Sequence, residues 1–132
     1  RQMCIRDSYP FGYGLSYSDF TYEKIESVKQ DKKNIRVTVS VKNTSGRDGE
    51  EVVQLYASYP DSKVERPSKQ LRAFRRIPIK AGETRKVTLT VPKEELGYWN
   101  EGKQMFVVEP GTVKLLIGAS SEDIRLEGKI RL

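Results

Sequence analysis

Histidine is absent from the sequence, and Cys4 is its single cysteine. One cysteine cannot form an internal disulfide, and without histidine neither a Ser-His-Asp triad nor a Cys-His pair can be built. Zinc sites made of cysteine and histidine are excluded for the same reason. We therefore expect no disulfide framework, no metal site and no cofactor.

Long apolar runs are also missing. No stretch approaches the roughly 20 consecutive apolar residues that a membrane helix needs, and the start holds no signal-peptide core. Residues 1–8 (RQMCIRDS) share none of the patterning that follows, so we interpret them as a non-native lead-in. We expect a soluble polypeptide whose localisation is not fixed by the sequence. A periplasmic or secreted parent is compatible with it.

Alternation of apolar and polar residues dominates the chain from Lys33 onward. Successive side chains of a β-strand point to opposite faces, so a period of two predicts strands with one buried and one wet face. The clearest run places Ile35, Val37, Val39 and Val41 on one side. Further strands are expected at 20–28, 53–59, 71–79, 87–91, 105–108, 113–117 and 124–132.

Turn-forming residues separate these runs at 43–49 (NTSGRDG), 81–82 (AG) and 109–111 (EPG), which predicts hairpins between sequential strands. Residues 92–96 (PKEEL) predict one short helical turn between sheets. The fold class that we predict for residues 20–132 is all-β: an antiparallel immunoglobulin-like sandwich of about seven to eight strands. The cysteine pair of true immunoglobulin domains is missing, so a fibronectin type III-like sandwich fits better, and a barrel is the alternative.

Aromatic residues are concentrated ahead of this region. Residues 9–22 hold six of the twelve aromatic side chains. Exposed rings are unfavourable in water, so they should pack against something. We interpret residues 9–19 as an aromatic linker that docks on a domain absent from the chain. The docking residues would be Tyr9, Phe11, Tyr13, Leu15 and Tyr17. Folding back over the chain's own sandwich and direct ligand contact are the alternatives.

Several long stretches carry a family resemblance. YPFGYGLSYSDFTY (9–22) resembles the segment that joins the catalytic part of family 3 glycoside hydrolases, of β-glucosidase and β-xylosidase type, to their C-terminal fibronectin type III-like domain. Similar to that family's signature stretches, in the same order, are NTSGRDGEEVVQLYASYP (43–60), RPSKQLRAFRRIPIKAGETRKVTLTV (66–91) and FVVEPGTVKLLIGASS (106–121).

The resemblance covers about residues 9–132. It implies a parent chain whose catalytic barrel and α/β sandwich domain precede this region and are its partners. The two catalytic carboxylates of the family reside in those domains, so no catalytic residue is carried over to this sequence.

The acidic residues themselves do not indicate a catalytic pair. A retaining glycosidase needs two carboxylates about 5 Å apart in a cleft. The closest pairs here are Glu50-Glu51 and Glu94-Glu95. Neighbours on a strand point to opposite faces, so we expect them to be solvated and the isolated chain to be inactive.

Basic residues form a band. Nine basic and two acidic residues lie between Lys63 and Lys86, a local charge of +7, whereas the remainder nets −1 against a total of +6. A solvated outer face is one interpretation. Docking of Arg72, Arg75 and Arg76 on carboxylates of the absent domains is another, because a guanidinium can bind a carboxylate bidentately. Phe74, the band's single ring, is expected in the core, so we expect no nucleic-acid or membrane partner.

Three other rings suggest a rival function. Tyr98 and Trp99 fall in an expected loop, and Tyr56 falls on the polar face of its strand. Exposed rings of this kind could contact sugars, although plugging the end of the core is the favoured interpretation of Tyr98 and Trp99. Our leading hypothesis is a non-catalytic accessory domain that stabilises a family 3 glycoside hydrolase. A carbohydrate-binding module and a basic surface for nucleic acid or anionic lipid are the alternatives.

Overall fold

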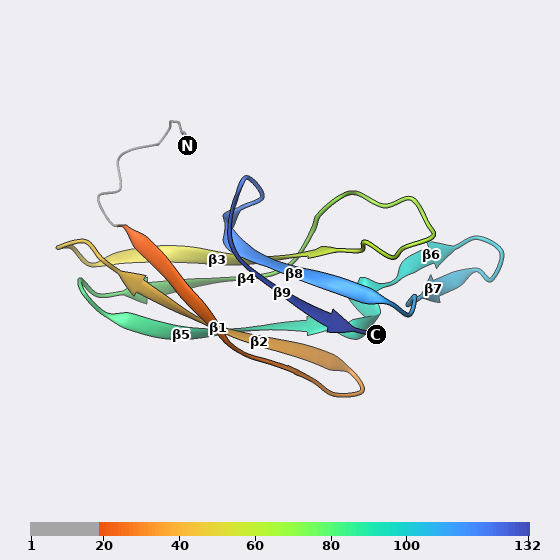
Figure 1. Ribbon diagram of the computed structural model, residues 1–132, viewed down its shortest axis with the longest axis horizontal. Helices are drawn as coiled ribbons and strands as arrows, with labels where there is room; N and C mark the ends of the chain where they lie inside the picture. Colours follow the sequence, from red (N-terminus) through yellow and green to blue (C-terminus); the bar gives the residue numbers. More distant parts are fainter. Residues whose placement is uncertain (1–18) are drawn as a thin grey trace.

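The computed structural model describes residues 19–132, which form two stacked antiparallel sheets and a small hairpin (Figure 1). One sheet has the order β1 (Phe20–Gln30), β2 (Asn34–Asn43), β5 (Thr84–Pro92). The other has the order β4 (Gln70–Ile79), β3 (Gly49–Ser58), β8 (Thr112–Ser120), β9 (Asp123–Arg131). The hairpin consists of β6 (Tyr98–Asn100) and β7 (Met105–Val107), preceded by the 3-10 turn η2 (Lys93–Leu96).

The predicted all-β sandwich and the short turn after Pro92 are therefore confirmed. The strand that the sequence did not indicate is β6, which brings the number within residues 19–132 to nine. The predictions for residues 1–8, and those for Tyr9, Phe11, Tyr13, Leu15 and Tyr17, lie outside the described residues.

None of the three turns at 43–49, 81–82 and 109–111 forms the expected hairpin. The third leads from β7, which pairs with β6, to β8, which pairs with β3 and β9, and the first two are crossings between the sheets. β2 pairs with β5, and β3 pairs with β4 and β8, so the β2–β3 and β4–β5 connections both change sheet. The buried Asn43 holds these connections together: its Nδ2 donates to the carbonyls of Arg47 at 2.7 Å and Ile79 at 2.9 Å. The amide of Gly82 donates to the Asn43 carbonyl at 2.8 Å. Turn residues fix the reversal of the chain but not the sheet that it joins.

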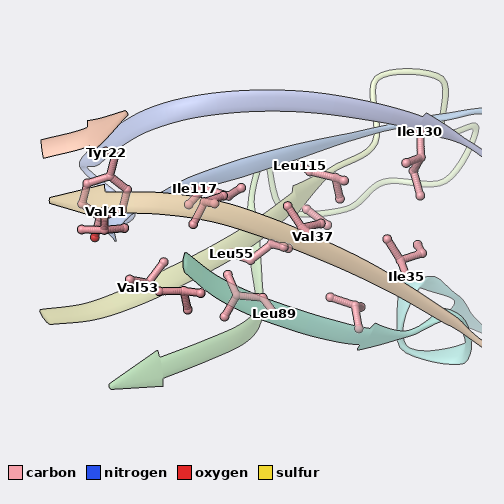
Figure 2. Close-up of a cluster of buried hydrophobic side chains, with 14 of the residues drawn as sticks. Tyr22, Ile35, Val37, Val41, Val53, Leu55, Leu89, Leu115, Ile117 and Ile130 are labelled. Carbon is pink, nitrogen blue, oxygen red and sulfur yellow. The ribbon is translucent and has the colours of Figure 1, made fainter. Parts of the chain in front are cut away.

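The core lies between the two sheets (Figure 2). The alternating residues of β2 behave as predicted, since Ile35, Val37, Val39 and Val41 are all fully buried. They face apolar residues from the other sheet, among them Leu55 of β3. Full burial of such side chains is worth about 1.5–3 kcal/mol each. Because both sheets contribute to one core, the described region should unfold as one unit.

Arginines close the side of the sandwich where the edge strands β4 and β5 meet. Arg75 Nη1, on β4, donates to the carbonyl of Thr88 on β5 at 3.5 Å. Arg85 Nη1, on β5, donates in return to the carbonyl of Pro78 on β4 at 3.0 Å. Unpaired edge groups invite pairing with other chains, and these two charged side chains obstruct it.

Candidate docking surface

Two large apolar side chains of β4 are exposed. Leu71 is 45% and Phe74 is 66% exposed. Their cross-strand partners on β3 are Tyr56 and Gln54, which lie on the face opposite to the buried Leu55. The expectation that Phe74 lies in the core is therefore wrong. We call Leu71, Arg72, Phe74 and Arg76 the β4 surface.

The register of β4 explains this exposure. Ile77 and Ile79 are buried, so alternation places Phe74 on the outer face. A register shift between Leu55 and Tyr56 then moves Leu71 to the outer face as well, beside Phe74. A bulge of this kind redirects a side chain without changing the strand's partner.

The three arginines predicted to dock all lie on β4, but they are engaged differently, and Arg75 is in phase with the buried Ile77 rather than with Phe74. Arg76 Nη1 lies 3.2 Å from Glu50 Oε1 in an exposed ion pair. Arg75 reaches the Thr88 carbonyl, as described above. Arg72 Nη2 donates to Gln70 Oε1 at 2.7 Å, whereas its Nε is buried with no hydrogen-bond partner among the described residues. Arg72 therefore keeps one donor that the described residues leave unsatisfied.

Shallow depressions adjoin the β4 surface. One lies between β4 and β5 and is lined by residues that include Leu71, Phe74, Thr90 and Pro92. A second continues toward the β6–β7 hairpin, where Gly97 and Phe106 line it. Arg72 and Glu95 line both depressions, so a cation and an anion lie where the two meet.

The residues predicted to contact sugar are not gathered into one platform. Trp99 is 46% exposed and meets Phe106 edge-on, with ring centroids 5.3 Å apart and an angle of 76°. Tyr98 is half-buried, and the Arg66 guanidinium lies 5.3 Å from its ring centroid. Tyr56 lies on β3 opposite Leu71, and its hydroxyl donates to Gln54 Oε1. Sequence reasoning missed Phe106 as an exposed ring.

Arg66 belongs to the basic band but forms an internal anchor. Its Nη2 lies 2.8 Å from Glu109 Oε1, and its Nη1 donates to the Leu96 carbonyl at 2.9 Å. The guanidinium also lies 3.9 Å from the ring centroid of Tyr59. The Arg66 and Glu109 side chains are 6% and 18% exposed.

Glu109 is held by several donors. It accepts hydrogen bonds from the Ser62 hydroxyl at 2.6 Å and the Lys63 amide at 3.1 Å. These bonds and the Arg66 charge hold the pKa of Glu109 below its ordinary value. The ion pair between Arg66 and Glu109 therefore fixes the β3–β4 loop against the loop that precedes β8.

Glu51 is not solvated as expected. Its Oε2 accepts a hydrogen bond at 3.0 Å from the hydroxyl of Tyr22, a core residue of β1. Burial raises the pKa values of both Glu51 and Tyr22. The Arg125 guanidinium lies 5.0 Å from the Tyr22 ring centroid. Glu51 thus links the two sheets, while Glu50 is exposed and pairs with Arg76.

Residues 19–132 offer neither a metal site nor a membrane-spanning helix. No group of three Asp, Glu, Cys or His residues that could hold a metal ion occurs there. The described helical structure contains nothing long and apolar enough to cross a membrane.

Comparison with known families and proteins identifies relatives. The family model described as a fibronectin type III-like domain matches residues 51–121. Thermostable beta-glucosidase B of Acetivibrio thermocellus is 40% identical over 131 residues, which cover 97% of this chain and 17% of that protein. Probable beta-glucosidase D of Emericella nidulans is 37% identical over 143 residues, covering 94% of this chain and 18% of that protein.

Solved structures agree with these relatives. The beta-glucosidase of Kluyveromyces marxianus superposes with a TM-score of 0.84 at 36% identity, covering 94% of this chain and 15% of that one. The GH3 beta-glucosidase of Bifidobacterium adolescentis gives a TM-score of 0.84 at 35% identity, covering 94% of this chain and 18% of that one. The chain spans a fifth or less of the length of these relatives.

Proposed function

This chain belongs to the fibronectin type III-like domain family, and on that premise we propose that it is a non-catalytic accessory domain of a family 3 glycoside hydrolase of the β-glucosidase type. One observation carries the proposal. Nearly the whole chain, 97%, matches 17% of a β-glucosidase at 40% identity. The partners would be the catalytic domains of the same parent chain.

The described residues support a role without chemistry. Glu50 and Glu51 point to opposite sides of β3, one to Arg76 and one to Tyr22, so they do not face each other across a cleft. A glycosidase needs two carboxylates on opposite sides of one sugar-sized site. What the domain offers instead is a rigid sandwich with an exposed apolar surface on β4.

Activity and stability assays test the proposal. The 132-residue chain should fold yet leave an aryl β-glucoside unhydrolysed, and deleting residues 19–132 from the parent enzyme should lower the parent's Tm. Turnover by the chain that Glu51→Gln or Glu95→Gln abolishes would exclude a non-catalytic role. An unchanged Tm of the shortened parent would exclude a stabilising one.

A carbohydrate-binding module is the second candidate, and the exposure of Trp99 and Phe106 favours it. The edge-on arrangement of these rings gives no common flat face, however, and the Arg66 guanidinium lies over the ring of Tyr98. Pull-down on insoluble polysaccharides, comparing the unsubstituted 132-residue chain with its Trp99→Ala variant, separates the two candidate functions. Retention that Trp99→Ala abolishes would favour the binding module.

A further inference from the structure

We propose that the β4 surface is the site through which this domain docks on the catalytic part of its parent chain. The occupant would be an apolar protein surface that presents a hydrogen-bond acceptor to Arg72. This inference rests on the proposed accessory function and adds to it the residues and the chemistry of the contact.

Apolar exposure is the first reason. Leu71 and Phe74 lie side by side on the outer face of the four-stranded sheet, where burial of apolar surface is worth about 25 cal/mol per Å². At the far edge of that sheet, the outer positions of β9 carry Glu127, Lys129 and Arg131 instead. Contiguous exposed apolar side chains with charged neighbours are typical of a protein contact.

The unpaired donor of Arg72 is the second reason. Buried polar atoms normally have a hydrogen-bond partner, and one without a partner is costly. Three such atoms occur in the described region, in Tyr59, Arg66 and Arg72. Of these residues, Arg72 alone lines the depressions that adjoin Leu71 and Phe106. If the Arg72 side chain turns toward the occupant, a carbonyl or carboxylate there would satisfy its Nε and the apolar residues would be buried in the same step.

The surroundings favour protein over other occupants. Arg72 and Glu95 offer a donor and an acceptor together, which suits the alternating C=O and N–H groups of a polypeptide. Arg76 is paired with Glu50, and the two apolar side chains at the centre of the surface, Leu71 and Phe74, offer no hydrogen-bond donor to a phosphate backbone. Phe74 is the one exposed ring of this surface, and the aliphatic Leu71 beside it gives no second face on which a sugar could stack.

The relatives supply a source for this occupant. More than four fifths of the length of Acetivibrio thermocellus beta-glucosidase B lies outside the part that this chain matches. A surface on that remainder is tethered to the domain, so docking is intramolecular and even a small contact is populated.

The test applies the same substitutions in two settings. Leu71→Asp combined with Phe74→Asp is made in the 132-residue chain and in the full-length parent, with Met105→Asp as a matched control. Met105 is 52% exposed and lies on β7, outside the β4 surface. In the isolated chain, the double variant and the control should both leave the Tm close to that of the unsubstituted 132-residue chain, because the altered side chains are exposed.

In the full-length parent, the double variant should raise the rate of thermal inactivation by about tenfold or more, the loss typical of a central interface contact. Met105→Asp should leave that rate unchanged. Arg72→Met, which keeps the apolar stem but removes the donor, should raise it by a smaller factor.

Equal inactivation rates for the double variant and Met105→Asp would overturn the inference. The accessory function would still stand if deletion of residues 19–132 lowered the parent's Tm, so the two failures are distinguishable. The inference is also overturned if the isolated chain is a dimer that the double variant converts to monomer, since the surface would then join two copies. Retention on polysaccharide that the double variant abolishes would overturn it in favour of a sugar occupant.

Discussion

Replacing Arg66 by alanine should destabilise the isolated domain strongly. The substitution leaves the Glu109 carboxylate, 18% exposed, without its guanidinium partner, and the Leu96 carbonyl without its donor. Removing one partner of a buried ion pair costs about 3–5 kcal/mol. Ser62 and Lys63 continue to stabilise the carboxylate, so we expect about 3 kcal/mol, the lower end of that range. The Tm should fall by about 10 °C.

Urea unfolding of the 132-residue chain, followed by circular dichroism, measures this loss. The control is Arg76→Ala, which breaks the exposed pair with Glu50 and should cost within about 0.5 kcal/mol. Arg66→Ala costing no more than this control would refute the anchoring role.

The pH dependence of unfolding gives a second test of the Arg66–Glu109 ion pair. The pKa of Glu109 is lowered in the folded state, so its contribution is present above the unfolded pKa and is lost as the pH falls through the folded one. The difference in unfolding free energy between the unsubstituted 132-residue chain and Arg66→Ala should therefore shrink as the pH falls below about 4.5, the ordinary pKa of a glutamate. A difference that stayed constant into acid would argue against an ion pair.

Three further substitutions test other parts of the fold. Tyr22→Phe removes the donor to the half-buried Glu51 and should cost about 1–3 kcal/mol in urea unfolding; no loss would mean that water replaces the hydroxyl. Gly118→Ala places a Cβ 2.0 Å from a backbone oxygen of β9 and should cost at least about 3 kcal/mol, whereas wild-type stability would show that this bulge can shift. Arg75→Ala with Arg85→Ala should change stability little but increase self-association by light scattering, because the β4 and β5 edges lose their charged obstruction; a strictly monomeric variant would contradict that role.

Sequence periodicity was sufficient to predict which residues are buried where one face of a strand is uniformly apolar. β2 is the clear case, since every apolar residue of its alternating run is buried. Two of the wrong expectations, those for Phe74 and Glu51, could have been avoided from the sequence. Phe74 is out of phase with the buried Ile77 and Ile79, and Glu51 is in phase with the buried Val53. Their positions follow from alternation, but a large ring and a carboxylate suggest the opposite environment when composition alone is considered.

Other features depend on the tertiary fold. The outward turn of Leu71 follows from a register shift against β3, which no local pattern marks. The crossing of two connections depends on Asn43, whose side chain reaches a carbonyl 36 positions away. The arginines of β4 can be assigned to one strand from the sequence, but the partner that each guanidinium finds depends on where β5 lies relative to β4. The short β6 has too few residues to show any period.

Oxidative footprinting of Leu71 and Phe74 tests the central claim most directly. Hydroxyl radicals modify side chains in proportion to their exposure, so the modification rates are compared between the 132-residue chain and the full-length parent, with Met105 as the internal reference. A docked accessory domain predicts that both rates fall in the parent relative to Met105. Equal relative rates in the two proteins would mean that the β4 surface stays exposed and would contradict the account.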